Sequence, residues 1–279
     1  MIFRQQGFEK LAEALSWCRD LAIPEVTVYA FSIENFKRSP SEVEGLMVLM
    51  QEKFEQLLRE TEALHKYGIR IKVLGDISLL TQRIQELVAK ITLATKNNSK
   101  YCLNIALAYT SRQEMCAAIE TVSKGVASGH IRTEDINELL LEKCLYTAGS
   151  QDPDLLIRTS GETRLSDLLM WQTGLSYLYF MKALWPQISI WHFLAAIFHY
   201  QRHHHFLVEL RKLQQASVEG RIADNNRIVW LRQKMESKCD ESTLEDFVGK
   251  RNERTDNFLG LVNSTREKTL KLLAKIGKD

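Results

Sequence analysis

The feature that most constrains this fold is an alternation between short apolar runs and segments in which apolar residues recur at helical spacing. The apolar runs predict buried strands at residues 26–31, 69–75, 102–108, 154–157 and 177–180. The helical spacing predicts helices at about residues 8–18, 40–58, 80–97, 112–126, 134–141 and 191–206. Strands joined through helices run parallel, because parallel neighbours need long crossover connections. We therefore predict an α/β fold, a parallel sheet with helices on both faces.

The pattern changes after Phe206. Residues 207–279 are charged and almost free of glycine and proline, and their apolar residues keep helical spacing. We predict two domains, an α/β domain from residue 1 to 206 and a C-terminal helical arm from 207 to 279, and we interpret the arm as a helical hairpin. In the α/β domain we expect ligands beyond the carboxyl ends of the strands.

The net charge narrows the class of ligand. The 37 Lys and Arg residues against 35 Asp and Glu residues give a net charge of only +2, too balanced for a chain wrapped in nucleic acid. An anionic ligand therefore needs a local cluster of basic residues.

The cysteine spacing bears on the compartment. No CxxC pair occurs, so a reducing compartment fits best. With neither a secretory leader nor a run of about 18–20 apolar residues, we expect a protein that faces the cytosol or lies on a membrane surface.

Two polar segments follow predicted strands and are candidates for chemistry. The first contains Ser32, Glu34, Asn35, Arg38 and Glu42. The second contains Arg158, Arg164 and Ser166 around a glycine. A guanidinium group can donate two parallel hydrogen bonds to phosphate oxygens, and backbone amides at the start of a helix also attract an anion. The second segment therefore predicts an anion site.

The alternative is that these arginines pair with nearby acids on a solvated loop, the acids being Asp154, Glu162 and Asp167. For each arginine alone, this alternative is slightly favoured. Two arginines and a serine at the end of one strand favour the anion site.

Both segments belong to longer blocks that resemble a known family. TVYAFSIENFKRSPSE at 27–42 and PDLLIRTSGETRLSDLLMWQ at 153–172, with Leu184-Trp185-Pro186 beyond, resemble the signature blocks of cis-prenyltransferases, the undecaprenyl diphosphate synthase-like family. The resemblance runs from about residue 7 to 201 and is strongest to the eukaryotic catalytic subunits. It implies the cis-prenyltransferase fold and a Mg²⁺-dependent enzyme that condenses isopentenyl diphosphate onto a farnesyl-type allylic diphosphate. The product would be a long-chain cis-polyprenyl diphosphate for dolichol synthesis and protein glycosylation.

The resemblance also implies roles for single residues. Ser32, Glu34, Asn35, Arg38 and Glu42 match the block that closes over the active site and aligns the substrates, so they are the catalytic candidates.

The substrate-binding candidates follow from the same match. They are Arg158, Arg164 and Ser166 for the pyrophosphate of isopentenyl diphosphate, with the aromatic residues Phe31 and Phe36. Lesser family blocks, at Gly75-Asp76 and at Asn104, Tyr109, Arg112 and Glu114, are expected to be nearer structural than catalytic. The apolar stripe of Leu46, Met47, Met50 and Phe54 matches the helix that lines the product tunnel, although ordinary core packing is the commoner role of such a stripe.

The chain departs from the family in three places. The family's first block, a strand followed by Met-Asp-Gly-Asn-Arg-Arg with a Mg²⁺-binding aspartate, does not occur in the sequence, so we expect a first strand to be absent. We also expect a poor catalyst, and we interpret the chain as an incomplete gene product, a fragment or a splice form. Tyr177 stands where bacterial members carry a metal-binding glutamate, so no metal ligand is assigned.

The third departure concerns partners. The family's carboxyl-terminal Arg-x-Gly is not present, and eukaryotic catalytic subunits receive it from a non-catalytic partner, the Nogo-B receptor subunit. We therefore expect a hetero-oligomer on the cytosolic face of the endoplasmic reticulum membrane, with residues 207–279 joining further copies. The alternative for the arm is a helical cap on its own domain. The alternative for the whole chain is a non-catalytic scaffold subunit or inactive fragment, against which the intact Arg158, Arg164 and Ser166 argue.

Overall fold

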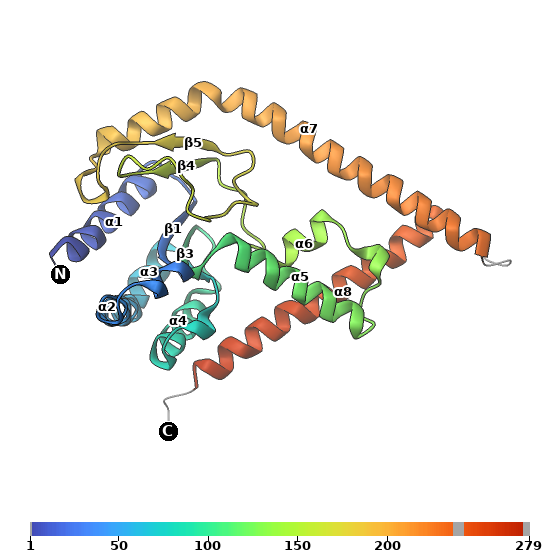
Figure 1. The fold of residues 1–279 in the computed structure, drawn as a ribbon, viewed down its shortest axis with the longest axis horizontal. Coiled ribbons are helices and arrows are strands. Elements are labelled where there is room, and N and C mark those ends of the chain that lie inside the picture. Colours follow the sequence, from blue (N-terminus) through green and yellow to red (C-terminus); the bar gives the residue numbers. More distant parts are fainter. Residues whose placement is uncertain (1, 237–242, 276–279) are drawn as a thin grey trace. The chain divides into compact units, whose positions relative to one another are not determined.

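The computed structural model describes residues 2–236 and 243–275. Its helices are α1 (Ile2–Asp20), α2 (Pro40–Arg59), α3 (Thr61–Tyr67), α4 (Gln82–Thr95), α5 (Ser111–Ala127), α6 (Glu138–Cys144), α7 (Ile190–Glu236) and α8 (Leu244–Leu273). Its strands are β1 (Glu25–Ser32), β2 (Ile69–Leu74), β3 (Tyr101–Tyr109), β4 (Leu155–Arg158) and β5 (Tyr177–Phe180). Short 3₁₀ helices are η1 (Ile33–Lys37), η2 (Ile77–Leu79), η3 (Thr133–Asp135) and η4 (Trp185–Gln187). Figure 1 shows these elements coloured along the sequence.

All of these strands run parallel to their neighbours. A three-stranded sheet has the order β1-β3-β2, and a two-stranded sheet pairs β4 with β5. The registers place Ser32 opposite Tyr109 and Arg158 opposite Phe180. The predicted class, an α/β fold with a parallel sheet flanked by helices, is confirmed.

The core lies on one face of the three-stranded sheet. Alternate residues of a strand point to the same face, so Leu103, Ile105 and Leu107 of β3 share it. They pack in one apolar cluster with α2 and α4, through residues such as Phe54 and Ile91. Packing in this core holds β1 and β3 in place. It therefore also positions the polar residues at their carboxyl ends.

Two predicted helices differ in extent from those observed. The helix predicted near residues 191–206 continues without a break to Glu236 as α7. The helix predicted at 134–141 is replaced by η3 and the later α6. Asn137 Oδ1 accepts the Leu140 N–H at 2.9 Å, so the side chain of Asn137 caps α6 and sets its start.

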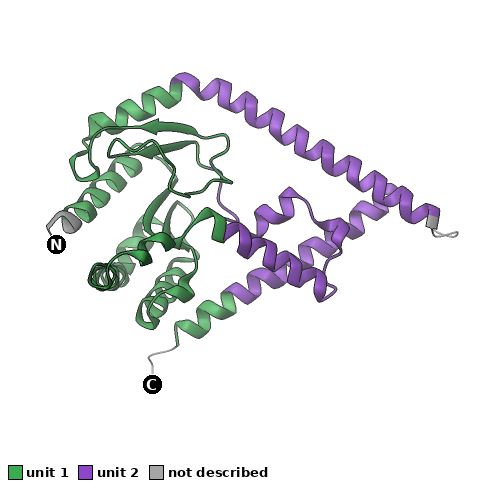
Figure 2. Cartoon of the chain, viewed as in Figure 1, with its two compact units in different colours: residues 1–113, 153–201, 267–279 green, residues 114–152, 202–266 purple. Residues whose placement is uncertain are grey.

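The chain forms two compact units, shown in different colours in Figure 2. Unit 1 comprises residues 1–113, 153–201 and 267–279, and unit 2 comprises residues 114–152 and 202–266. These units differ from the predicted division at residue 206, because residues 114–152 group with helices of the arm. The division into an α/β domain at residues 1–206 and a helical arm at 207–279 stays a prediction.

Unit 2 is held together by a buried ionic cluster. Asp135 is paired with Arg251, at 3.3 Å, and with Arg254, at 2.7 Å. Arg251 also donates to Asn226 of α7, which joins α7 and α8 within the unit.

Across the described ranges, none of the helices combines the length and the apolar character that crossing a bilayer requires.

Candidate active site

The candidate site lies where β1, β3 and β4 end. Ser32 is the last residue of β1 and pairs in register with Tyr109, the last residue of β3. Arg158 is the last residue of β4. In an open parallel α/β sheet, this carboxyl edge is the usual place for a ligand.

The segment after β1 is ordered by its own side chains. Ser32 Oγ accepts the Glu34 N–H at 3.2 Å, and Asn35 Oδ1 accepts the Ser32 N–H at 2.9 Å. These two bonds form a capping box that starts η1. Glu34 is exposed and forms an ion pair with Lys37 at 2.5 Å. Ser32 and Asn35 therefore fix the backbone that presents Glu34 beside the strand ends.

The other predicted residues of this segment lie on the surface or in the core. Arg38 and Glu42 are exposed, and Glu42 accepts a hydrogen bond from Ser39 Oγ at 3.0 Å. Phe31 is only 2% exposed, and its ring meets Phe36 edge to face with centroids 4.9 Å apart. Both rings contribute to the apolar core. The catalytic and substrate-binding roles of these residues stay predictions.

The second segment brings Arg158 and Ser166 together. Arg158 Nη2 lies 3.4 Å from Ser166 Oγ, to which it donates. Arg158 Nε is buried and has no hydrogen-bond partner among the residues that the structure describes. A buried guanidinium N–H without an acceptor is costly, so a ligand oxygen would satisfy it. Arg158 and Ser166 are thus arranged for an anion.

Arg164 is placed differently. Its side chain is 70% exposed and pairs with Glu162, as the ion-pair alternative predicts for this residue. The structure therefore brings Arg158 and Ser166 into one site and leaves Arg164 on the surrounding loop. Whether Arg164 binds substrate stays a prediction.

Tyr29 lies at the site, although its position in an apolar run predicts only a place in a buried strand. Its hydroxyl lies 3.0 Å from the Tyr109 carbonyl and 3.3 Å from the Ser166 carbonyl, to which it can donate. Burial raises the pKa of Tyr29, a hydrogen bond with Ser32 lowers this pKa, and the charge of Asp167 raises it. The contacts show that Tyr29 links the end of β3 to the loop after β4.

Arg112 and Asp167 form a second link that the sequence did not single out as functional. Arg112 Nε donates to Asp167 Oδ2 at 2.8 Å, and this bond raises the pKa of Arg112. The two residues are 55 positions apart, so no local pattern could predict their contact.

A protein site for Mg²⁺ usually includes one or two carboxylates. The described ranges contain no group of three or more His, Cys, Asp or Glu side chains that could hold a metal ion. Two carboxylates near the ends of the strands, Glu34 and Asp167, are each paired with a basic side chain. These residues do not by themselves fit a Mg²⁺ site.

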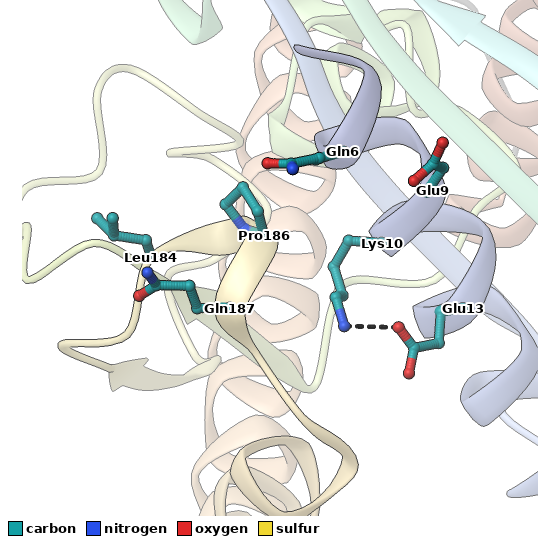
Figure 3. A pocket seen from close by; sticks show the side chains of 7 residues that line it. All are labelled: Gln6, Glu9, Lys10, Glu13, Leu184, Pro186 and Gln187. Atoms are coloured by element: carbon teal, nitrogen blue, oxygen red, sulfur yellow. Dashed lines mark hydrogen bonds and ion pairs between the residues drawn. The ribbon is translucent and has the colours of Figure 1, made fainter. Parts of the chain in front are cut away.

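A separate hollow of about 410 Å³ is lined by residues of α1 and of the Leu184–Gln187 segment (Figure 3). Lys10 and Glu13 form an ion pair in it, at 2.5 Å. None of the predicted site residues lines this hollow.

The parallel strands present a serine and a partly unsatisfied arginine at a carboxyl edge, an arrangement suited to an anionic ligand. The sequence profile of a family described as putative undecaprenyl diphosphate synthase matches residues 3–207. The chain belongs to this family, the cis-prenyltransferases, and is a transferase by class.

Individual relatives agree with this assignment. The dehydrodolichyl diphosphate synthase complex subunit DHDDS of Homo sapiens is 46% identical over 262 residues, covering 91% of this chain and 79% of the relative. The tritrans,polycis-undecaprenyl-diphosphate synthase (geranylgeranyl-diphosphate specific) of Thermococcus kodakarensis is 43% identical over 196 residues, covering 70% of this chain and 74% of the relative. The crystal structure of lavandulyl diphosphate synthase from Lavandula x intermedia in complex with dimethylallyl diphosphate superimposes with a TM-score of 0.66 at 29% identity, covering 71% of this chain and 84% of that one.

Proposed function

We propose that this chain is a catalytic subunit that condenses isopentenyl diphosphate onto an allylic prenyl diphosphate and so makes a long-chain cis-polyprenyl diphosphate for dolichol synthesis. The observation that carries the proposal is the juxtaposition of Arg158 with Ser166, together with the unsatisfied Arg158 Nε. The name of the human relative, a dehydrodolichyl diphosphate synthase complex subunit, supports the product class.

The site's part in the reaction is to bind and orient one substrate. Arg158 and Ser166 hold the diphosphate of isopentenyl diphosphate, which stays attached to the growing chain in that turnover. The double bond of isopentenyl diphosphate attacks the allylic carbon of the other substrate, from which pyrophosphate leaves. The added isoprene unit then loses a proton, which forms the new double bond. Holding the two substrates in one orientation removes much of the entropic part of the barrier.

Mg²⁺ dependence is part of the proposal and rests on family membership. A hard cation of this kind usually binds through one or two carboxylates and the oxygens of a substrate phosphate, where it neutralises charge.

We further propose that the chain works with a non-catalytic partner subunit like the Nogo-B receptor, at the cytosolic face of the endoplasmic reticulum membrane. The name of the human relative, which calls it a complex subunit, supports a partner. The long apolar product supports a membrane surface, because it leaves water for lipid. Co-purification with the partner and flotation with liposomes test the two parts separately.

The functional proposal is tested by incorporation of radiolabelled isopentenyl diphosphate. The assay uses the chain with the family's first block added ahead of Met1, together with the partner subunit. Arg158→Ala should lower kcat/KM by about 10²-fold, as expected for loss of a charged hydrogen bond worth about 3 kcal/mol. Arg221→Ala, which removes an exposed ion pair with Glu138 in unit 2, is the matched control and should leave kcat/KM unchanged. Parent-like kinetics for Arg158→Ala would remove this residue from the site.

A further inference from the structure

We propose that Asp167 is a positioning residue for the diphosphate site. It holds the turn that carries Ser166 against the first residues of α5, and through this turn it sets the place of Ser166 beside Arg158. The inference rests on the proposed function of that site and deepens it.

The turn needs support because its backbone is strained. Ser166, Asp167 and Leu169 have φ angles of +52°, +59° and +46°, the left-handed region that residues with a side chain seldom adopt. Such a conformation persists only where the surroundings over-determine it, and it is typical of functional sites.

Asp167 takes part in three bonds that join this turn to the start of α5. Its carbonyl accepts the Ser111 N–H at 2.8 Å. Its carboxylate accepts the Arg112 backbone N–H at 3.2 Å through Oδ1, and the Arg112 Nε–H at 2.8 Å through Oδ2. In return, Ser111 Oγ accepts the Met170 N–H at 2.9 Å. The turn and the start of α5 are thus joined in both directions.

The burial of the two charged groups shows which bonds matter most. The Asp167 side chain is only 13% exposed, whereas that of Arg112 is 74% exposed. An exposed ion pair contributes little in water, while an unmet bond to a buried group costs more. The bonds from Asp167 to the backbone of α5 therefore hold the turn more firmly than the charge of Arg112 does.

The turn connects directly to the anion site. Ser166 precedes Asp167 in the chain, its carbonyl faces the Tyr29 hydroxyl at 3.3 Å, and its Oγ lies 3.4 Å from Arg158 Nη2. A shift of the Asp167 backbone therefore moves Ser166 away from Arg158. The competing explanation is that Asp167 only stabilises the fold.

Titration calorimetry with isopentenyl diphosphate, and separately with inorganic pyrophosphate, separates the two explanations. Asp167→Ala should weaken binding about tenfold, a change of about 1.4 kcal/mol. Asp167→Asn keeps an oxygen for the Arg112 N–H and also tolerates positive φ, so it should recover most of the affinity. Arg112→Ala should have a smaller effect than Asp167→Ala.

The matched control is Glu55→Ala, which removes another arginine–carboxylate contact of unit 1, that with Arg83 at 3.0 Å. It should bind like the parent. If Asp167→Ala does not fold, Asp167→Gly replaces it, because glycine accepts positive φ and equally lacks the carboxylate.

The outcomes distinguish this inference from the functional proposal. If Arg158→Ala loses binding while Asp167→Ala binds within twofold of the parent, the positioning role is wrong and the site stands. If Arg158→Ala binds like the parent, the diphosphate site itself is wrong and the positioning role fails with it. Equal losses in Asp167→Ala and Glu55→Ala would indicate general destabilisation and would also overturn the inference.

Discussion

Replacing Asp135 by alanine should destabilise unit 2 strongly. Asp135 is completely buried, and its carboxylate accepts two hydrogen bonds of 2.7 Å from Arg254 and one of 2.8 Å from the Arg132 N–H. It also pairs with Arg251, which is 3% exposed. The variant removes the counter-charge and leaves the guanidinium of Arg251 buried.

The expected loss follows from that uncompensated charge. Breaking a buried ion pair by removing one partner costs about 3–5 kcal/mol. Since a whole domain is stable by only about 5–15 kcal/mol, this is a large fraction. The loss exceeds what the pair itself contributes, because much of it is the penalty of leaving Arg251 in a poorly solvated place.

The same cluster predicts a pH dependence. Burial raises the pKa of Asp135, but the bonds from Arg254 and Arg132 and the charge of Arg251 lower it below its usual value overall. A group with a lowered pKa in the folded state stabilises the fold above its unfolded pKa, here about 3.9. This stability is lost as the pH falls from that value through the lower folded pKa. The free energy of unfolding of Asp135→Ala should therefore not show this loss at acid pH.

Urea unfolding and amide hydrogen exchange over residues 114–152 and 244–266 measure the effect. Glu138→Ala is the control, since it removes an exposed pair with Arg221 in the same unit and should cost no more than about 1 kcal/mol. A loss below about 1 kcal/mol for Asp135→Ala, or an equal loss for the control, would refute the reasoning.

Three further predictions concern the core, a close backbone approach and the arm. Phe31→Ala should lower the free energy of unfolding by about 3–5 kcal/mol in urea titrations, since its ring is 2% exposed; a loss under about 1 kcal/mol would contradict its core role. Gly75→Ala should lower Tm, because Gly75 has φ +137° and an added Cβ would lie 2.0 Å from the Leu107 carbonyl oxygen; an unchanged Tm would be the wrong result. Leu231 and Met235 lie on an exposed apolar part of α7. If the arm joins copies, the double variant Leu231→Glu with Met235→Glu should lower the mass of the complex with the partner, measured by light scattering. An unchanged mass would favour the self-contained cap.

The sequence was most informative where a local pattern reports burial. The strands were predictable because runs such as 102–108 are apolar except for Asn104, as is typical of a parallel strand buried on both faces. The pairing of Arg158 with Ser166 was predictable because both lie on one short segment after a strand. The continuation of the helix past residue 206 was missed, although no proline follows to stop it.

The remaining features depend on contacts between distant residues. Tyr29 reaches Ser166 across 137 positions, and Arg254 reaches Asp135 across 119. In the sequence, Tyr29 is an ordinary aromatic residue of a strand, and Asp135 is one acid among many. Only the folded chain shows that the first belongs to the site and that the second ties α8 to residues 114–152.

The central claim is that Arg158 and Ser166 bind a diphosphate, and a crystal structure with isopentenyl diphosphate tests it most directly. The account predicts a diphosphate oxygen within about 3 Å of both Arg158 Nε and Ser166 Oγ, the range of a charge-assisted hydrogen bond. A diphosphate bound elsewhere, with Arg158 Nε still lacking an acceptor, would contradict it.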